Sequence, residues 1–201
     1  LMKLGAIVVP LNTRFKGKEL AFEINDSESK VLIVDEEYWP FIDSVRDQLK
    51  TIEKIFFNGP RVPEGTLPFL LLKENREDAF TKATLLESDD AAIMYTSGTT
   101  GRPKGAILHH RGFVITAMLV SDFIQFEPED KMICCVPLFH ITGLSCLMLP
   151  PIFSGVACIY MRQFKTKDFL EIMAKEKVTQ YMGVVNVIWL MVNHPDFDQY
   201  D

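Results

Sequence analysis

The chain has 201 residues, of which 48% are hydrophobic and 24% are charged. This composition is typical of a globular protein and excludes collagen-like, coiled-coil and disordered chains. The formal net charge is -6, from 21 Lys and Arg against 27 Asp and Glu, which argues against a broad basic surface for nucleic acid.

Short runs rich in Val, Ile and Ala alternate with segments of helical spacing along the chain. The runs predict strands at 6–9, 31–34, 54–57, 91–95, 105–108, 132–136, 156–160 and 178–182. Helical spacing occurs at 20–24, 41–49 and 169–174, and 112–123 is apolar on nearly all sides, which predicts a buried helix. Most strands are continuously apolar, as expected when both faces of a sheet are covered. Repeated strand-then-helix units predict an α/β fold of mostly parallel β-sheet layers flanked by helices.

One stretch, 132–161, contains 30 residues without Asp, Glu, Lys or Arg, which is longer than the ~20 residues of a membrane helix. Pro137, Gly143, the Pro150–Pro151 pair and Gly155 divide it into pieces of strand or short-helix length. The stretch is therefore interpreted as buried core, without a transmembrane segment.

The four cysteines have neither CxxC nor His-interleaved spacing, and they lie in apolar runs at positions 134, 135, 146 and 158. They are expected to be reduced core residues of a cytoplasmic protein rather than disulfides or a zinc site. The chain starts without a positively charged leader or an apolar signal core, and it stops in loop-like sequence at 194–201. We therefore expect it to be a piece of a larger protein.

The most informative segment is a polar loop between two apolar strands. Residues 96–105 contain three Gly, four hydroxyl side chains and one Lys. Glycines allow consecutive backbone N–H groups to turn toward one concavity, while hydroxyls and a lysine add donors and a positive charge for phosphate oxygens. The pattern indicates a polyphosphate site.

Two other interpretations of this loop are weaker. A β-hairpin turn needs only about two to five residues and has no use for clustered hydroxyls. A Walker P-loop requires Gly, four residues, then Gly-Lys-Ser/Thr, but Pro103 stands five residues after Gly98 and Gly105 follows Lys104.

The sequence YTSGTTGRPKG at 95–105 resembles the phosphate-loop signature of the adenylate-forming (AMP-binding) superfamily. LGAIVVPLN at 4–12 and VPLFHITGL at 136–144 resemble two further core motifs of that family. The first of these is closer to the acyl-CoA synthetase branch than to the peptide-synthetase branch. The resemblance implies a fragment of the large N-terminal domain of an acyl-CoA synthetase-like protein.

Members of this superfamily join a carboxylate to AMP with release of pyrophosphate, and a thiol, usually that of CoA, then displaces AMP. The resemblance implies ATP, Mg²⁺ and CoA as cofactor, metal and cosubstrate. It implies that the β- and γ-phosphates are held by Thr96, Ser97, Gly98, Thr99, Thr100, Gly101 and Lys104. Lys104 would act in catalysis by stabilising charge, and Thr96 would also contact Mg²⁺.

His140 has two interpretations. It is either a hydrogen-bonded core histidine or, as the family's Pro-x-x-His motif implies, a catalytic imidazole that orients or gates the reacting carboxylate, which is already ionised at pH 7. In the second case, Thr142, Gly143 and Cys146 would border the acyl pocket. His110 matches a recurring family position, but we interpret it as starting the next helix. Val185 stands where the family often has Pro, which places the local pocket shape in question.

The family's adenine, ribose, hinge and lid segments have no counterpart in 1–201, so we expect the chain to be part of the N-terminal domain, without that domain's C-terminal half or the lid, and inactive alone. The leading hypothesis is an ATP-dependent carboxylate–CoA ligase for a fatty or other hydrophobic acid. A luciferase-like or amino-acid-activating enzyme and a noncatalytic nucleotide-binding or interaction module are the alternatives. Exposed sheet edges would allow a homodimer.

Overall fold

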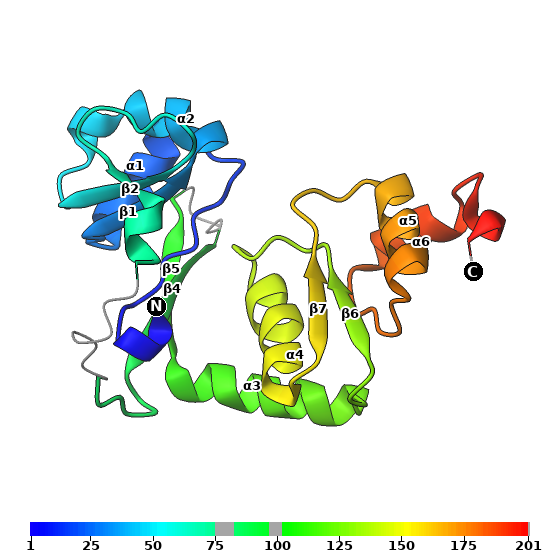
Figure 1. Cartoon of the computed structure of the whole chain (residues 1–201). Coiled ribbons are helices and arrows are strands. Elements are labelled where there is room, and N and C mark those ends of the chain that lie inside the picture. Colours follow the sequence, from blue (N-terminus) through cyan, green and yellow to red (C-terminus); the bar gives the residue numbers. More distant parts are fainter. Residues whose placement is uncertain (75–82, 97–101, 201) are drawn as a thin grey trace. The chain divides into compact units, whose positions relative to one another are not determined.

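The computed structural model describes residues 1–74, 83–96 and 102–200, in two compact units that divide at His109 and His110. The first unit contains, in chain order (Figure 1), α1 (Gly17–Asp26), β1 (Val31–Asp35), α2 (Trp39–Asp43), β2 (Lys54–Asn58), β3 (Leu67–Pro68), β4 (Asp90–Thr96) and β5 (Lys104–His109). The second contains α3 (His110–Ile124), β6 (Lys131–Cys134), a π-helical segment (Thr142–Met148), α4 (Leu149–Ser154), β7 (Ala157–Tyr160), α5 (Thr166–Glu176) and α6 (Val185–Val192). Short 3₁₀ turns lie at 2–4, 36–38, 46–48, 69–72 and 197–199.

The first unit is built on a parallel sheet of order β1-β2-β3. Leu32 and Val34 of β1 are buried against Leu20 and Ile24 of α1, in a core that also includes Ile42, Ile55 and Phe57. Alternate residues of a strand point to opposite faces, and here Val31 and Ile33 are exposed. The expectation that both faces are covered is therefore wrong for β1 in the described part of the chain.

A separate antiparallel hairpin, β4–β5, follows this sheet along the chain. Its register pairs Thr96 with Lys104, so these two residues face each other at the end of the hairpin where the chain passes from β4 to β5. The strand predicted at 6–9 is reduced to a single parallel bridge between Val8 and Ala92. The sequence predicts a mostly parallel fold, and β4–β5 is an antiparallel exception: only seven residues separate the two strands, fewer than the dozen or more that a crossover between parallel strands needs. The hairpin that the sequence analysis treated as the weaker interpretation is thus present.

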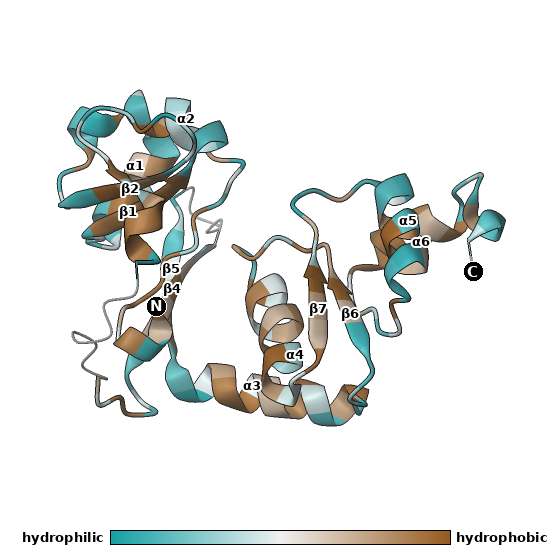
Figure 2. Cartoon of the chain, viewed as in Figure 1, coloured by the Kyte–Doolittle hydropathy of each residue, from teal (hydrophilic) through white to brown (hydrophobic). Residues whose placement is uncertain are grey.

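The second unit is centred on the parallel pair β6–β7. Met132 and Cys134 pack with Leu147 in one cluster, while Ile133 and Cys135 pack with Phe169 of α5 in another. β6 is thus buried on both faces, as its continuously apolar sequence predicts. The strand predicted at 178–182 forms one bridge, from Gln180 to Met132. The strands of both parallel sheets are mostly brown in Figure 2, which marks these apolar cores.

The helix predicted at 112–123 is present as α3, but its predicted burial is wrong. Phe113 and Ala117 are buried, whereas Phe123 is 81% exposed and Leu119 is 65% exposed. Within the second unit, α3 contacts α4 and the π-helical segment, and these neighbours cover one face of the helix. No described element of the second unit covers the outer face, which includes Leu119 and Phe123.

The apolar stretch 132–161 folds as short pieces, as its prolines and glycines predict. Pro150 and Pro151 lie in the first turn of α4, where a missing N–H costs no helical hydrogen bond. Gly155 then ends that helix at a φ of 73°, a left-handed conformation that favours glycine. In the described part of the chain, every helix is too short or too polar to span a lipid bilayer.

The four cysteines are free thiols, and Cys134 and Cys135 are buried. Burial raises the pKa of Cys134 to about 11 and also raises the pKa values of Cys135, Cys146 and Cys158. The prediction of core residues holds for Cys134 and Cys135, whereas Cys146 and Cys158 are only half-buried. The raised pKa values mean a low thiolate content, which makes these side chains poor nucleophiles.

Candidate functional site

The hairpin β4–β5 brings together the two described ends of the glycine-rich segment. Thr96 is the last residue of β4, Lys104 is the first residue of β5, and the two pair across the strands. Both side chains are exposed. The predicted phosphate contacts Ser97, Gly98, Thr99, Thr100 and Gly101 lie outside the described residues. The structure thus brings a hydroxyl and an ammonium group to the two ends of the same loop.

Gly105, which follows Lys104, is required by close packing within the hairpin. A Cβ atom at this position would lie 2.7 Å from Cγ2 of Ile93 and 3.2 Å from Cζ of Tyr95. Because Tyr95 is the residue paired with Gly105, a larger side chain would displace the Tyr95 ring. The glycine therefore allows β4 and β5 to pair closely at this end of the hairpin.

Tyr95 also connects the hairpin to α1. Its hydroxyl donates a hydrogen bond of 2.7 Å to Oδ2 of Asp26, and its ring packs edge-on against Phe22 with 6.4 Å between ring centroids. Burial, and next the hydrogen bond to Asp26, raise the pKa of Tyr95. The phenol consequently remains a hydrogen-bond donor throughout the physiological pH range.

The other predicted site residues lie together in the second unit. His140 is exposed at the turn before the π-helical segment; its backbone N–H donates to the carbonyl oxygen of Pro137 at 3.1 Å, and its carbonyl accepts from Leu144 at 3.0 Å. The imidazole lies 4.5 Å from the Phe139 ring, centroid to centroid. The interpretation of His140 as a buried core histidine is therefore wrong for the described structure.

Gly143 allows the π-helical segment to pack against the backbone that precedes His140. A Cβ at this position would lie 2.8 Å from the carbonyl oxygen of Val136 and closer still to that of Pro137. These are backbone atoms that cannot swing away, so only glycine fits. Thr142 and Cys146 belong to the same π-helical segment, the first exposed and the second half-buried. Such segments occur frequently at functional sites.

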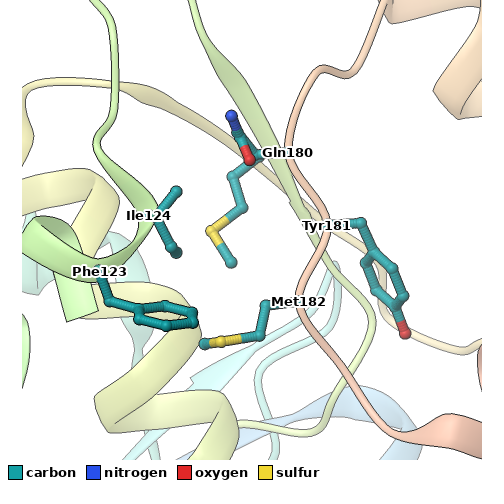
Figure 3. A pocket seen from close by; sticks show the side chains of 6 residues that line it. Phe123, Ile124, Gln180, Tyr181 and Met182 are labelled. Carbon is teal, nitrogen blue, oxygen red and sulfur yellow. The ribbon is translucent and has the colours of Figure 1, made fainter.

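A pocket of about 210 Å³ lies elsewhere in the second unit (Figure 3), and none of the predicted pocket residues lines it. Its walls come from the end of α3, from β6 and from the segment that follows α5. The lining residues are Phe123, Ile124, Met132, Gln180, Tyr181 and Met182. Sequence reasoning missed these residues, because five of the six are apolar or aromatic and have the same character as ordinary core residues.

Two further predictions concern helix starts. α3 begins at His110, which confirms that this position starts a helix. Val185 is the first residue of α6, a position at which Pro is also well tolerated. The departure from the family's Pro therefore leaves the helix start intact.

The described residues do not form a metal site by themselves. Among residues 1–74, 83–96 and 102–200, no group of three or more His, Cys, Asp or Glu could hold a metal ion. Thr96 would offer Mg²⁺ a single hydroxyl oxygen, whereas Mg²⁺ favours six oxygen ligands and is usually held by carboxylates together with substrate phosphates.

Comparison with known proteins places the chain among similar sequences and structures. The family model described as AMP-binding enzyme matches residues 1–201. 4-Coumarate–CoA ligase 1 of Petroselinum crispum is 32% identical over 98% of this chain and 36% of its own length. Long-chain-fatty-acid–CoA ligase FadD13 of Mycobacterium tuberculosis is 31% identical over 99% of this chain and 38% of its own length. The crystal structure of the anthranilate CoA ligase AuaEII in complex with anthranoyl-AMP superimposes with a TM-score of 0.90 at 28% identity, covering 99% of this chain and 39% of that one. The chain thus spans less than half the length of each.

Proposed function

Because the chain belongs to the AMP-binding enzyme family, whose members include adenylate-forming CoA ligases, we propose that it is part of an ATP-dependent carboxylate–CoA ligase. The observation that supports this most directly is the pairing of Thr96, the last residue of β4, with Lys104, the first residue of β5. The pairing sets a hydroxyl and a positive charge at the two ends of a loop rich in glycine and hydroxyl residues. A triphosphate is the ligand that such a set of donors suits best.

In the proposed first step, a carboxylate oxygen attacks the α-phosphorus of ATP, and the bond to the bridging oxygen of pyrophosphate breaks. Lys104 would stabilise the negative charge that develops on the departing pyrophosphate, and Thr96 would donate a hydrogen bond to it. Thr96 would offer one hydroxyl oxygen to Mg²⁺, which would supply further neutralisation of negative charge. His140 would orient the incoming carboxylate, which needs no general base because it is ionised at pH 7.

In the proposed second step, the sulfur of CoA bonds to the acyl carbon, the bond from that carbon to the phosphate oxygen breaks, AMP leaves with the electron pair, and the thiol proton passes to solvent. We propose a hydrophobic carboxylic acid, fatty or aromatic, as the substrate. Support comes from two relatives whose names give coumarate and long-chain fatty acids as substrates. Their identities to this chain are nearly equal, so the proposal includes both aromatic and fatty acids. Thr142, Gly143 and Cys146 would border the acyl group.

We further propose that the chain forms part of the large N-terminal domain and does not turn over alone. The experiment is ATP–pyrophosphate exchange by the full-length protein with a panel of carboxylic acids. Lys104→Ala should slow exchange by about ten- to a thousandfold, the range for a lost charge-stabilising donor. Lys54→Ala, which removes an exposed lysine at the start of β2, is the matched control and should leave the rate unchanged. Equal rates for the two variants would contradict the assignment of Lys104, and exchange by the 201-residue chain alone would contradict its inactivity.

A further inference from the structure

The contact between Tyr95 and Asp26 joins two parts of the first unit that are 69 residues apart in sequence. Asp26 is the last residue of α1, and Tyr95 is the residue before Thr96. The hydrogen bond therefore connects the end of a helix to the end of the strand that precedes the glycine-rich segment. A substitution that removes the Asp26 carboxylate would leave the Tyr95 hydroxyl, at the end of β4, without this hydrogen bond.

The Tyr95 ring is held on two sides. Phe22, one turn before Asp26 on α1, meets the ring edge-on at an interplanar angle of 77°. Across the hairpin, Gly105 allows the ring to lie against the β5 backbone, with a hypothetical Cβ only 3.2 Å from Cζ. The ring thus has little space to move, and the Asp26 hydrogen bond fixes its tip.

The electrostatic surroundings keep Tyr95 in the donor form. Burial raises the pKa of Tyr95 most, followed by the hydrogen bond to Asp26 and the charges of Asp26 and Glu23 on α1, against a smaller opposite contribution from the Ser27 hydroxyl. A protonated phenol facing a carboxylate makes a charge-assisted hydrogen bond, which is stronger than a bond between neutral groups. The connection between α1 and the hairpin is therefore maintained across the pH range in which an enzyme of this kind would work.

We propose that Asp26 is a positioning residue for the pair Thr96 and Lys104: through Tyr95 it fixes the end of β4, and hence the placement of these two side chains against the nucleotide. This inference rests on the proposed ATP-dependent activity. It assigns to α1, outside the recognised loop motif, a role in ATP affinity. Asp26 itself touches no reacting atom and acts only through the tyrosine.

The test compares steady-state kinetics of the full-length protein with four substitutions. Tyr95→Phe and Asp26→Ala each remove the hydrogen bond and should raise KM for ATP about three- to tenfold, with KM for the carboxylic acid unchanged. Asp26→Asn keeps an acceptor oxygen and should restore KM for ATP to within about twofold of the wild type. Asn58→Ala is the matched control, because it removes a hydrogen bond to Asp35 in the same unit without touching the hairpin.

Hydrogen–deuterium exchange of the same variants gives a readout that does not depend on activity. Amides of β4 and β5 should exchange faster in Tyr95→Phe and Asp26→Ala than in Asp26→Asn or Asn58→Ala. A wild-type protein without acid-dependent ATP–pyrophosphate exchange would overturn the proposed function and this inference with it. An active wild type whose KM for ATP is unchanged in Tyr95→Phe and Asp26→Ala, or is raised equally by Asn58→Ala, would overturn the inference alone.

Discussion

Glu23 is a buried carboxyl group whose ionisation should make the first unit less stable as the pH rises. The residue is 1% exposed on α1, and neither side-chain oxygen has a hydrogen-bond partner among the described residues. Burial, with a smaller contribution from the charge of Glu19, raises the pKa of Glu23 from 4.5 to about 7. We expect Glu23→Gln, which keeps the shape of the protonated side chain, to remove this pH dependence.

The magnitude follows from proton linkage. Between pH 4.5 and about 7 the folded chain holds a proton on Glu23 that the unfolded chain has released, so the free energy of unfolding falls as pH rises through this window. A difference of about 2.5 pKa units at 1.36 kcal/mol each corresponds to about 3 kcal/mol. That stability is fully present below pH 4.5 and is lost above pH 7. Glu23→Gln should therefore match the wild type near pH 4.5 and be more stable by up to about 3 kcal/mol at pH 8.

Urea denaturation at a series of pH values would measure this difference. Trp39 packs in the core of the first unit, 5.7 Å from the Phe57 ring, so its fluorescence reports unfolding of that unit. Glu36→Gln, which changes an exposed glutamate of the same unit, is the control and should keep the wild-type pH dependence. Unfolding free energies of the wild type and Glu23→Gln that run parallel from pH 5 to 8 would refute the reasoning.

Three further predictions concern the second unit. Gly143→Ala should lower the free energy of unfolding by about 1–3 kcal/mol, because the added Cβ meets the carbonyl oxygens of Val136 and Pro137; a stability equal to the wild type in urea would contradict this packing. Gly112→Ala, in α3 with nothing within 4 Å of the added Cβ, should instead stabilise by about 0.5–1 kcal/mol in the same assay, and a loss would show that this helix position is covered. Phe169→Ala should lower the free energy of unfolding by about 3–5 kcal/mol, because the fully buried ring packs against Phe164 and Tyr181. Thermal unfolding would detect a fall of several degrees in the melting temperature, and an unchanged melting temperature would rule out a central role for this ring.

The sequence predicted the strands and helices whose pattern is local. Strands predicted at 31–34, 54–57 and 132–136 are present as β1, β2 and β6 with shifts of one or two residues. The helix predicted at 41–49 instead ends at Asp43, because Val45 takes a non-helical φ of -126°. Val45 also packs tightly on α1, where a Cβ at Gly17 would lie 2.8 Å from its Cγ1. Tertiary packing has overridden the helical spacing there.

Strand predictions failed where pairing partners were few. The runs at 6–9 and 178–182 each form only one bridge, since a strand needs a neighbour along its whole length and apolar composition cannot reveal whether one is present. The same limit explains the exposed face of α3. An apolar sequence predicts that a helix will be covered, but the covering residues are determined by the fold and not by the helix itself.

For the candidate site, the flanking strands and the paired ends Thr96 and Lys104 agree with the motif, while the roles of the predicted site residues stay predictions. Asp26 could not be predicted, because its partner Tyr95 is 69 residues away. One signal was present in the sequence, since a tyrosine in an apolar strand usually needs a partner for its hydroxyl. That signal indicates that a partner exists, without indicating which residue it is.

The facing positions of Thr96 and Lys104 have a consequence for how the protein tolerates changes in length. The two strands hold these residues opposite each other through their own ladder of backbone hydrogen bonds. Under this condition, doubling the number of connecting residues costs only about 0.6 kcal/mol of chain entropy. Insertions between these two positions should therefore change the length of the connection while β4 and β5 remain folded.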